Sequence, residues 1–305
     1  MIQLLHGTNI PFMKYRHIAY WFSAIVIAAT AVWLVMHGGP HYSVDFTGGT
    51  VLRVRSDQPI AVDQLRGAVD AAGHPGSEIQ QLTGTSNHDY LIRMQSHTGS
   101  EDPFPAIQNA AAQHANAKLE LLSTDAVGPK VGGELRSKAI WAVLGSLGWI
   151  LIYVGFRYEF KFALGAVVAI FHDVFVTLGV LCFANREISL TVVAALLTIA
   201  GYSINDTIVV FDRIRERSKA LRKEKHSRVM DLAVNETLSR TIITALTVFL
   251  TSLALLVWGG EVLRDFSFAM VIGLVFGTYS SVYVASGLAL DTWIWLDRRK
   301  GVQAE

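Results

Sequence analysis

Residues 196–211 read LLTIAGYSINDTIVVF, an apolar run interrupted by one acidic residue, Asp206. The run extends from Ile188 to Phe211, which is long enough to cross a bilayer, since a spanning helix takes about 20 apolar residues. A carboxyl group in this setting is costly unless it is protonated, paired or hydrated. The stretch therefore predicts a membrane-spanning helix in which Asp206 has a function, the alternative being a hydrogen-bonded structural aspartate near the membrane edge.

Five further runs have similar length and composition. Of the 305 residues, 51% are hydrophobic and only 17% are charged, whereas soluble domains carry about 25% charged residues. We expect an α-helical polytopic membrane protein, and we expect the first run to be an uncleaved anchor because no clear small-x-small cleavage site follows it. The six predicted transmembrane helices cover residues 18–36, 139–156, 162–184, 188–211, 241–258 and 266–290.

The basic residues predict the orientation of these spans. The short flanks on one side carry fifteen Lys and Arg residues, while the short loops on the other side carry only Arg186 and Arg264. Short cytoplasmic loops are enriched in Lys and Arg. We therefore expect one large external segment, 37–137, and four cytoplasmic segments: the N-terminus 1–17, the short loop with Arg157 and Lys161, a basic loop 212–238 and the C-terminus 291–305.

The external segment reads as a small folded domain. Alternating and helical apolar patterns occur in the order β-α-β-β-α-β, which is the ferredoxin-like α+β arrangement. The single cysteine, Cys182, lies in an apolar run, so an ordinary core must hold this domain together. The predicted elements are strand 51–55, helix 62–72, strand 78–82, turn 83–89, strand 90–94, helix 103–117, strand 118–123 and a link to the membrane over 126–138.

Arg240 is the natural partner of Asp206. It begins the fifth span, and an antiparallel pair of spans would bring it to the depth of Asp206. The alternative is a basic residue that only marks the membrane interface. Burial favours the neutral form of a carboxyl group and a nearby guanidinium favours the charged form. A motion that separates and reunites the two groups would therefore bind and release a proton.

Two more titratable residues, His172 and Asp173, lie near the middle of the third span. Asp173 is either a second member of a proton relay or a fixed carboxylate bonded to Ser, Thr or Asn of the fourth span, and His172 is either a supporting group or a packed histidine. Three polar neighbours of Asp206 are candidates to hydrate or hydrogen-bond it, although they are also normal helix-packing residues: Ser203, Asn205 and Thr207.

Other chemistries find little support in the sequence. It contains no Walker loop, no CxxC and no HExxH, and no nucleophile–base constellation, so we expect neither an enzyme nor a metal or cofactor. The formal net charge of +1 does not indicate nucleic-acid binding. Gly273 and Gly277, followed by Ser280 and Ser281, permit close helix packing in the last span.

Four motifs together resemble a known family. They are VDFTGG at residues 44–49, FHD at 171–173, GYSINDTIVVFDRIRE at 201–216 and NETLSRT at 235–241. In this order they resemble the SecD/SecF family of protein-export membrane proteins, part of the RND transporter superfamily. The resemblance implies a six-span half of an RND-type transporter in the bacterial inner membrane, with the external domain in the periplasm.

The resemblance also implies a function and partners. The expected function is that of an accessory subunit of the Sec translocase, using the proton motive force for late steps of protein export, with Asp206 and Arg240 as the proton relay. The expected partners are SecD as the complementary half, the SecYEG channel, YajC and exported polypeptides. A small-molecule efflux subunit and a structural assembly factor remain alternatives, and sodium remains an alternative to the proton.

The first of these motifs also has a bottom-up interpretation. Gly48 and Gly49 permit a backbone bend where the chain leaves the membrane for its first strand. Asp45, beside Phe46, is placed to cap that junction. A structural role is favoured here, with a hinge as the alternative.

Overall fold

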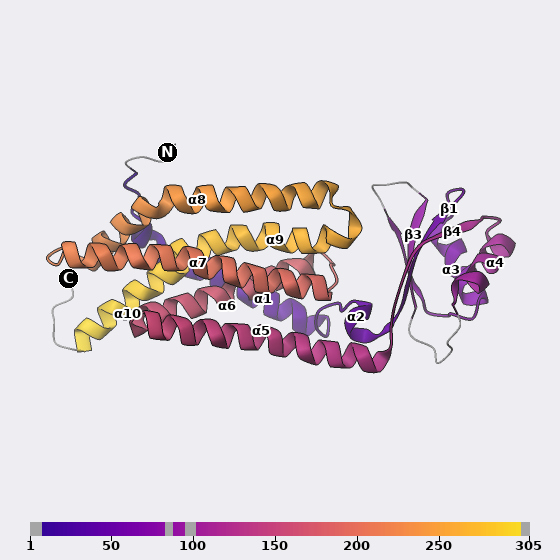
Figure 1. The fold of residues 1–305 in the computed structure, drawn as a ribbon, viewed down its shortest axis with the longest axis horizontal. Helices are drawn as coiled ribbons and strands as arrows, with labels where there is room; N and C mark the ends of the chain where they lie inside the picture. Colours follow the sequence, from indigo (N-terminus) through magenta and orange to yellow (C-terminus); the bar gives the residue numbers. More distant parts are fainter. Residues whose placement is uncertain (1–7, 83–87, 95–101, 300–305) are drawn as a thin grey trace. The chain divides into compact units, whose positions relative to one another are not determined.

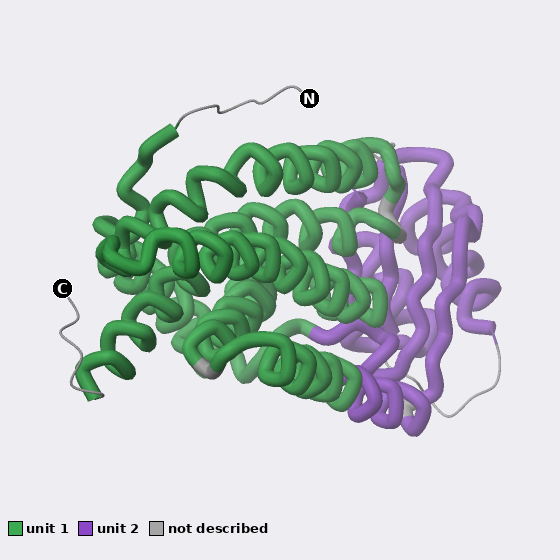
Figure 2. The backbone as a smooth tube through the Cα atoms, turned by 60° about the vertical axis from the view of Figure 1, so that its left-hand side comes forward, with its two compact units in different colours: residues 1–41, 140–305 green, residues 42–139 purple. Residues whose placement is uncertain are grey.

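The computed structural model describes residues 8–82, 88–94 and 102–299. Parts of the predicted termini and of the predicted turn 83–89 lie outside these residues. The chain divides into two compact units, coloured separately in Figure 2. Residues 1–41 and 140–305 form a helix bundle, and residues 42–139 form a sheet domain inserted after the first long helix.

Six helical spans in the described part of the chain are long and apolar enough to cross a membrane, as predicted. The last span is continuous but changes its helical pitch, because a π-helical turn separates two α-helices. Figure 1 shows these helices: η1 (Phe12–Tyr15) leading into α1 (Arg16–Met36), α5 (Pro129–Arg157), α6 (Phe160–Phe183), α7 (Leu190–Ala220), α8 (His226–Trp258), and α9 (Gly260–Ser280) continuing through the π turn η2 (Ser281–Ala285) into α10 (Ser286–Arg299).

Three helices, α6, α7 and α9, form the centre of the bundle. Helix α9 packs against α6, α7 and α8, and α1 packs against α6. Small residues let these helices approach closely, as the glycine spacing predicts: a Cβ on Gly273 would overlap Ile199, and one on Gly179 would overlap Thr30. By contrast, few residues are buried in the most apolar windows of α1, α5 and α8, which suits helices that face lipid or another membrane protein.

The helices extend beyond the apolar runs. Where the sequence predicts a basic loop over 212–238, α7 continues to Ala220 and α8 begins at His226. The charged ends of these two helices are joined by Glu236 of α8, which accepts hydrogen bonds from Arg213 (2.6 Å) and Arg217 of α7. The predicted link 126–138 is likewise divided between the last strand of the sheet domain and the start of α5.

The sheet domain has the predicted ferredoxin-like topology. Its sheet has the order β2-β3-β1-β4, and every neighbouring pair is antiparallel. Helices α3 and α4 pack against each other and on strands of this sheet. The elements are α2 (Val44–Thr47), β1 (Gly49–Ser56), α3 (Val62–Ala71), β2 (Glu78–Leu82), β3 (Asp89–Met94), α4 (Phe104–His114) and β4 (Leu119–Val127).

The core of this domain lies between the sheet and its two helices. Leu52 and Val54 of β1 pair with Ile92 and Tyr90 of β3, and all four are fully buried. The Tyr90 hydroxyl donates to the carbonyl oxygen of Ile60 (2.7 Å) and accepts from its amide (2.8 Å). A disulfide is therefore not needed, since apolar burial and a satisfied buried tyrosine hold the fold.

Candidate functional site

Asp206 lies on the buried face of α7 and is only 8% exposed. Two hydroxyl groups bind its carboxylate. The Thr241 hydroxyl of α8 donates to Oδ1 (2.6 Å), and the Ser281 hydroxyl at the start of the π turn donates to Oδ2 (2.5 Å). Hydrogen bonds to a charged acceptor are the short, strong kind. The structure thus stabilises a buried carboxylate with neutral donors from two neighbouring helices.

Arg240 lies close enough to Asp206 for an electrostatic interaction, although its side chain does not bind the carboxylate in the described structure. Its neighbour Thr241 contacts Asp206, and adjacent helical residues point about 100° apart. Consistent with this, Arg240 is exposed. Within the described residues, no ion pair between Arg240 and Asp206 is present. The antiparallel packing of α7 and α8 therefore brings the two residues to one level, and an Asp206–Arg240 contact stays a prediction.

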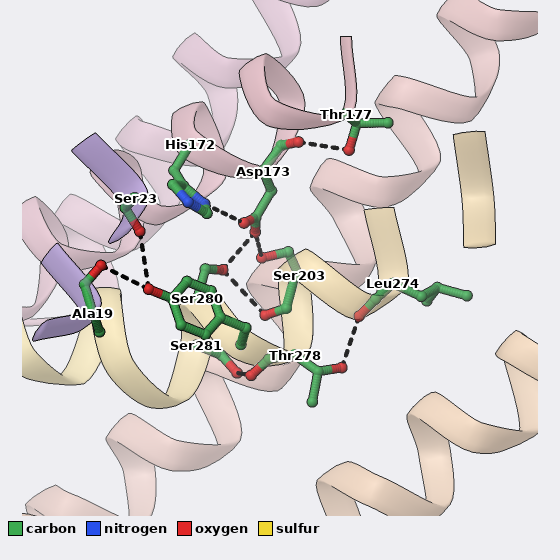
Figure 3. A network of polar contacts seen from close by, with 12 residues as sticks. Ala19, Ser23, His172, Asp173, Thr177, Ser203, Leu274, Thr278, Ser280 and Ser281 are labelled. Carbon is green, nitrogen blue, oxygen red and sulfur yellow. Dashed lines mark hydrogen bonds and ion pairs between the residues drawn. The ribbon is translucent and has the colours of Figure 1, made fainter. Parts of the chain in front are cut away.

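Asp173 on α6 is the second buried carboxylate of the bundle, and it is fully buried (Figure 3). Its Oδ2 accepts from the hydroxyls of Ser203 (2.5 Å) and Ser280 (2.7 Å), and its Oδ1 contacts Nδ1 of His172 (2.9 Å). The bond from Ser203 is the contact expected of a carboxylate fixed by the fourth span. Ser280 and His172 complete a site in which every ligand is itself buried.

His172 is a buried imidazole beside this carboxylate. It is 2% exposed, and its Nε2 has no hydrogen-bond partner in the part of the chain that the structure describes. Its ring lies 6.0 Å from that of Tyr279, whose hydroxyl donates to the Ala19 carbonyl (2.7 Å) and meets the Ser23 hydroxyl (3.1 Å). His172 therefore adds a second group that can bind a proton, next to the contact between α9 and α1.

The predicted polar neighbours of Asp206 are placed differently from one another. The Ser203 hydroxyl donates its hydrogen bond to Asp173, and Asn205 is exposed. Thr207 is buried, and its hydroxyl has no partner among the described residues. Within the described part of the chain, none of the three hydrogen-bonds to Asp206.

The hydroxyl ligands Thr241, Ser280 and Ser281 were not singled out as site residues from the sequence. The two serines stood out only as small residues that follow a glycine pair and suit close packing. The sequence does contain one indication of these ligands, because serine and threonine residues occur on the spans that neighbour the two buried acids. Serine and threonine are common in transmembrane helices as packing residues, so that signal is weak.

A π-helical turn, η2, lies beside both carboxylates. It begins at Ser281, and the Ser286 hydroxyl donates to the Ser281 carbonyl oxygen (2.9 Å), five residues back. The backbone of α6 approaches it closely, since a Cβ on Gly165 would be 2.5 Å from the Ala285 carbonyl oxygen. π turns inside α-helices occur frequently at functional sites.

The double-glycine motif forms a tight corner in the sheet domain. Ser43 caps α2 by accepting from the Asp45 amide (3.3 Å), and Phe46 is buried. Gly48 and Gly49 both have positive φ, and a Cβ on Gly49 would be 2.5 Å from the Met94 carbonyl oxygen. Glycine is the residue that this conformation admits without strain. The two glycines thus form the expected bend, but Ser43 caps α2 where the sequence predicted Asp45 as the capping residue.

The chemistry available in the bundle is proton binding. Asp173, Asp206 and His172 are buried among hydroxyl donors that can turn to donate or accept. No three His, Cys, Asp or Glu side chains gather as a metal site would require, as far as the described residues go. A six-span bundle with two buried carboxylates, and a ferredoxin-like domain after its first span, is a multi-pass membrane protein of the transporter type.

Comparison with known families agrees with this class. The family model "Protein export membrane protein SecD/SecF, C-terminal" matches residues 107–294, and the model "SecD/SecF GG Motif" matches residues 33–60. The chain belongs to the SecD/SecF family.

Relatives match over nearly the whole chain. The protein translocase subunit SecF of Gemmatimonas aurantiaca is 40% identical over 98% of this chain and 90% of its own length. The protein translocase subunit SecDF of Thermus thermophilus is 40% identical over 92% of this chain and 38% of its own length. The crystal structure of SecDF, a translocon-associated membrane protein from the latter organism, superposes with a TM-score of 0.85 at 37% identity, covering 96% of this chain and 40% of that one.

Proposed function

We propose that this protein is an accessory subunit of the Sec protein translocase and couples the proton motive force to late steps of protein export. The naming of relatives that match at about 40% identity over nearly the whole chain supports the translocase role. The observation that carries the coupling is Asp206, a carboxylate buried in the bundle and held by hydroxyls of two other helices.

The proposed cycle uses this geometry. In the state described here, Thr241 and Ser281 bind the Asp206 carboxylate, and Arg240 is near it without forming an ion pair. A rotation of α8 would exchange Thr241 for Arg240 at the carboxylate, because the two residues are adjacent on that helix. The ionised carboxylate is favoured when the guanidinium is near, and proton uptake is favoured when the helices part. Opening of the two states to opposite sides would couple proton flow to motion of the sheet domain.

A proton is favoured over sodium as the coupling ion. Both oxygens of Asp206 are occupied by hydroxyl donors, whereas a sodium site would require several oxygen atoms to converge with their lone pairs on one point. His172, in contact with Asp173, adds a further side chain that can bind a proton. The protein acts in this proposal as a transport subunit and not as an enzyme.

The proposed assembly is a pair of halves. The Thermus thermophilus SecDF chain is about two and a half times as long as the part matched here, since this chain covers 40% of it. We infer that SecD supplies the rest as a separate six-span half, that the pair works with SecYEG and YajC on exported polypeptides, and that it lies in the inner membrane. The excess of Lys and Arg in the flanks supports a cytoplasmic location for both termini and a periplasmic location for the sheet domain.

The test is secretion of a reporter protein by cells whose only copy of the chain carries Asp206→Asn. The matched control is Asp63→Asn, the same change at an exposed carboxylate of the sheet domain. We expect secretion to fall to the level of cells lacking the chain, with normal secretion in the control and normal copurification with SecD in both. Normal secretion with Asp206→Asn would mean that the buried carboxylate is structural and that the protein is a scaffold.

A further inference from the structure

Two adjacent serines connect the two buried carboxylates. The Ser280 hydroxyl donates to Asp173 (2.7 Å) and the Ser281 hydroxyl donates to Asp206 (2.5 Å). Adjacent helical residues point about 100° apart, so one turn of the last span can donate hydrogen bonds to a carboxylate on α6 and to another on α7. Both serines are fully buried, which excludes a role in solvating the bundle surface.

Helix α7 also contributes to both carboxylate sites. Ser203 donates to Asp173 (2.5 Å), and Asp206 follows it three positions later on the same helix. Residues three apart in a helix are neighbours on one face. The two carboxylates are therefore joined along two routes, one through α7 and one through the serine pair of the last span.

Each serine of the pair has one proton and two acceptors. The Ser280 hydroxyl lies 2.7 Å from Asp173 and 3.1 Å from the Gly277 carbonyl oxygen, and the Ser281 hydroxyl lies 2.5 Å from Asp206 and 3.0 Å from the Thr278 carbonyl oxygen. A hydroxyl donates only once. It donates to the carboxylate when the acid is ionised. When the acid carries a proton, the hydroxyl accepts from the carboxyl group and donates to the carbonyl oxygen of its own helix instead. Each serine thus responds to the protonation state of its acid without changing position.

The π turn begins at this pair. Ser281 is its first residue, and the Ser281 carbonyl is bonded by the hydroxyl of Ser286. A wide turn interrupts the regular backbone ladder, so hydrogen bonds here exchange between carbonyls more readily than in a continuous α-helix. A change in the partner of one serine is therefore transmitted to the backbone that holds the other.

We propose that Ser280 and Ser281 are positioning residues that couple the two carboxylates, so that proton binding at Asp206 changes proton binding at Asp173. This inference rests on the proposed function only in taking Asp206 as a site that gains and loses a proton. The other titratable or charged groups at the two acids, among the described residues, are His172 on α6, Tyr202 on α7, Arg240 on α8 and Tyr279 on α9.

The experiment is an infrared pH titration of the complete chain copurified with SecD in lipid. The carboxyl band of Asp173 is assigned by its loss in Asp173→Asn, and its titration is compared with and without Asp206→Asn. We expect removal of the Asp206 charge to shift the proton affinity of Asp173 at least about fivefold, the lower end of typical coupling between sites. In a Ser280→Ala, Ser281→Ala background we expect most of that shift to disappear.

Two further variants keep the test independent of folding. Ser267→Ala removes another fully buried serine hydroxyl of α9 whose oxygen has no partner among the described residues, and it should retain the wild-type shift. Ser281→Cys keeps the volume but supplies a weak donor, and it should reduce the shift in the same direction as the alanine pair. A shift of equal size with and without the serine hydroxyls would overturn the proposal.

The outcome is separable from that of the secretion test. If secretion tolerates Asp206→Asn while the serine-dependent shift is present, the coupling stands and the motor role of Asp206 falls. If secretion collapses while the shift does not depend on the serines, the motor role stands and the coupling through the serine pair is wrong.

Discussion

Replacing Gly165 by alanine tests how closely α6 packs against the π turn. A Cβ at this position would be 2.5 Å from the carbonyl oxygen of Ala285 and 3.3 Å from the amide nitrogen of Ala289, both of them backbone atoms that cannot rotate away. Overpacking of a tight interior costs about 1–3 kcal/mol. Each kcal/mol lowers the melting temperature of a domain of about 150–250 residues by about 2–4 °C, so we expect Gly165→Ala to melt roughly 2–12 °C below a Gly→Ala variant at an unhindered helix position.

The assay is thermal unfolding of the purified chain in detergent, followed by tryptophan fluorescence. The matched control is Gly145→Ala in α5, where an added Cβ would meet no atom within 4 Å. That variant should melt at or slightly above the wild-type temperature, because glycine in a helix costs about 1 kcal/mol relative to alanine. Equal melting temperatures for Gly165→Ala and Gly145→Ala would refute the close approach of α6 to the π turn.

Three further predictions concern other parts of the chain. Tyr90→Phe leaves the buried amide and carbonyl of Ile60 without their partner, which should cost about 1.4 kcal/mol or more. Hydrogen exchange of β1 and β3, measured in the whole chain, should then accelerate at least about tenfold. The control Tyr42→Phe removes a hydroxyl that has no hydrogen bond in the described structure, and it should leave exchange unchanged. In a variant whose single native cysteine is replaced by alanine, Lys219→Cys should be labelled only from the cytoplasm and Gln113→Cys only from outside; the reverse pattern would invert the proposed orientation. Asp291→Asn removes the charge that binds an arginine and a tyrosine of α1, each at 3.0 Å, and should lower the bundle's melting temperature by a few degrees, with no change if that end of α1 is held by packing alone.

The sequence predicted those features that depend on long apolar runs and on alternation. Six spans follow from hydrophobic length, and the ferredoxin-like strand order follows from the order of short periodic segments. Asp173 and Asp206 stood out for the same reason, because a carboxylate in an apolar run is conspicuous. The bond from Ser203 to Asp173 was among the alternatives, since a hydroxyl of the fourth span was one expected partner.

The features that were missed leave little trace in composition. Residues 281–285 read SVYVA, and this segment forms a π turn only because its neighbours pack closely against it. Thr241 was overlooked because its neighbour Arg240 carries a charge, although it is Thr241 that hydrogen-bonds to Asp206 in the structure. The segment 212–238 was expected to be a loop because its many charged residues interrupt the apolar runs, but α7 and α8 both continue beyond those runs.

The central strand of the sheet domain has a consequence for biosynthesis. β1 is the first strand to be made, yet one of its two edges pairs with β4, the last, with Gly49 opposite Val127. The ribosome must therefore complete almost the whole inserted domain before that edge is covered, and α5 begins at Pro129, immediately after β4. Closing the sheet and presenting the second membrane span thus become nearly simultaneous events, which limits the time during which an unpaired strand of the nascent chain is open to association with other polypeptides.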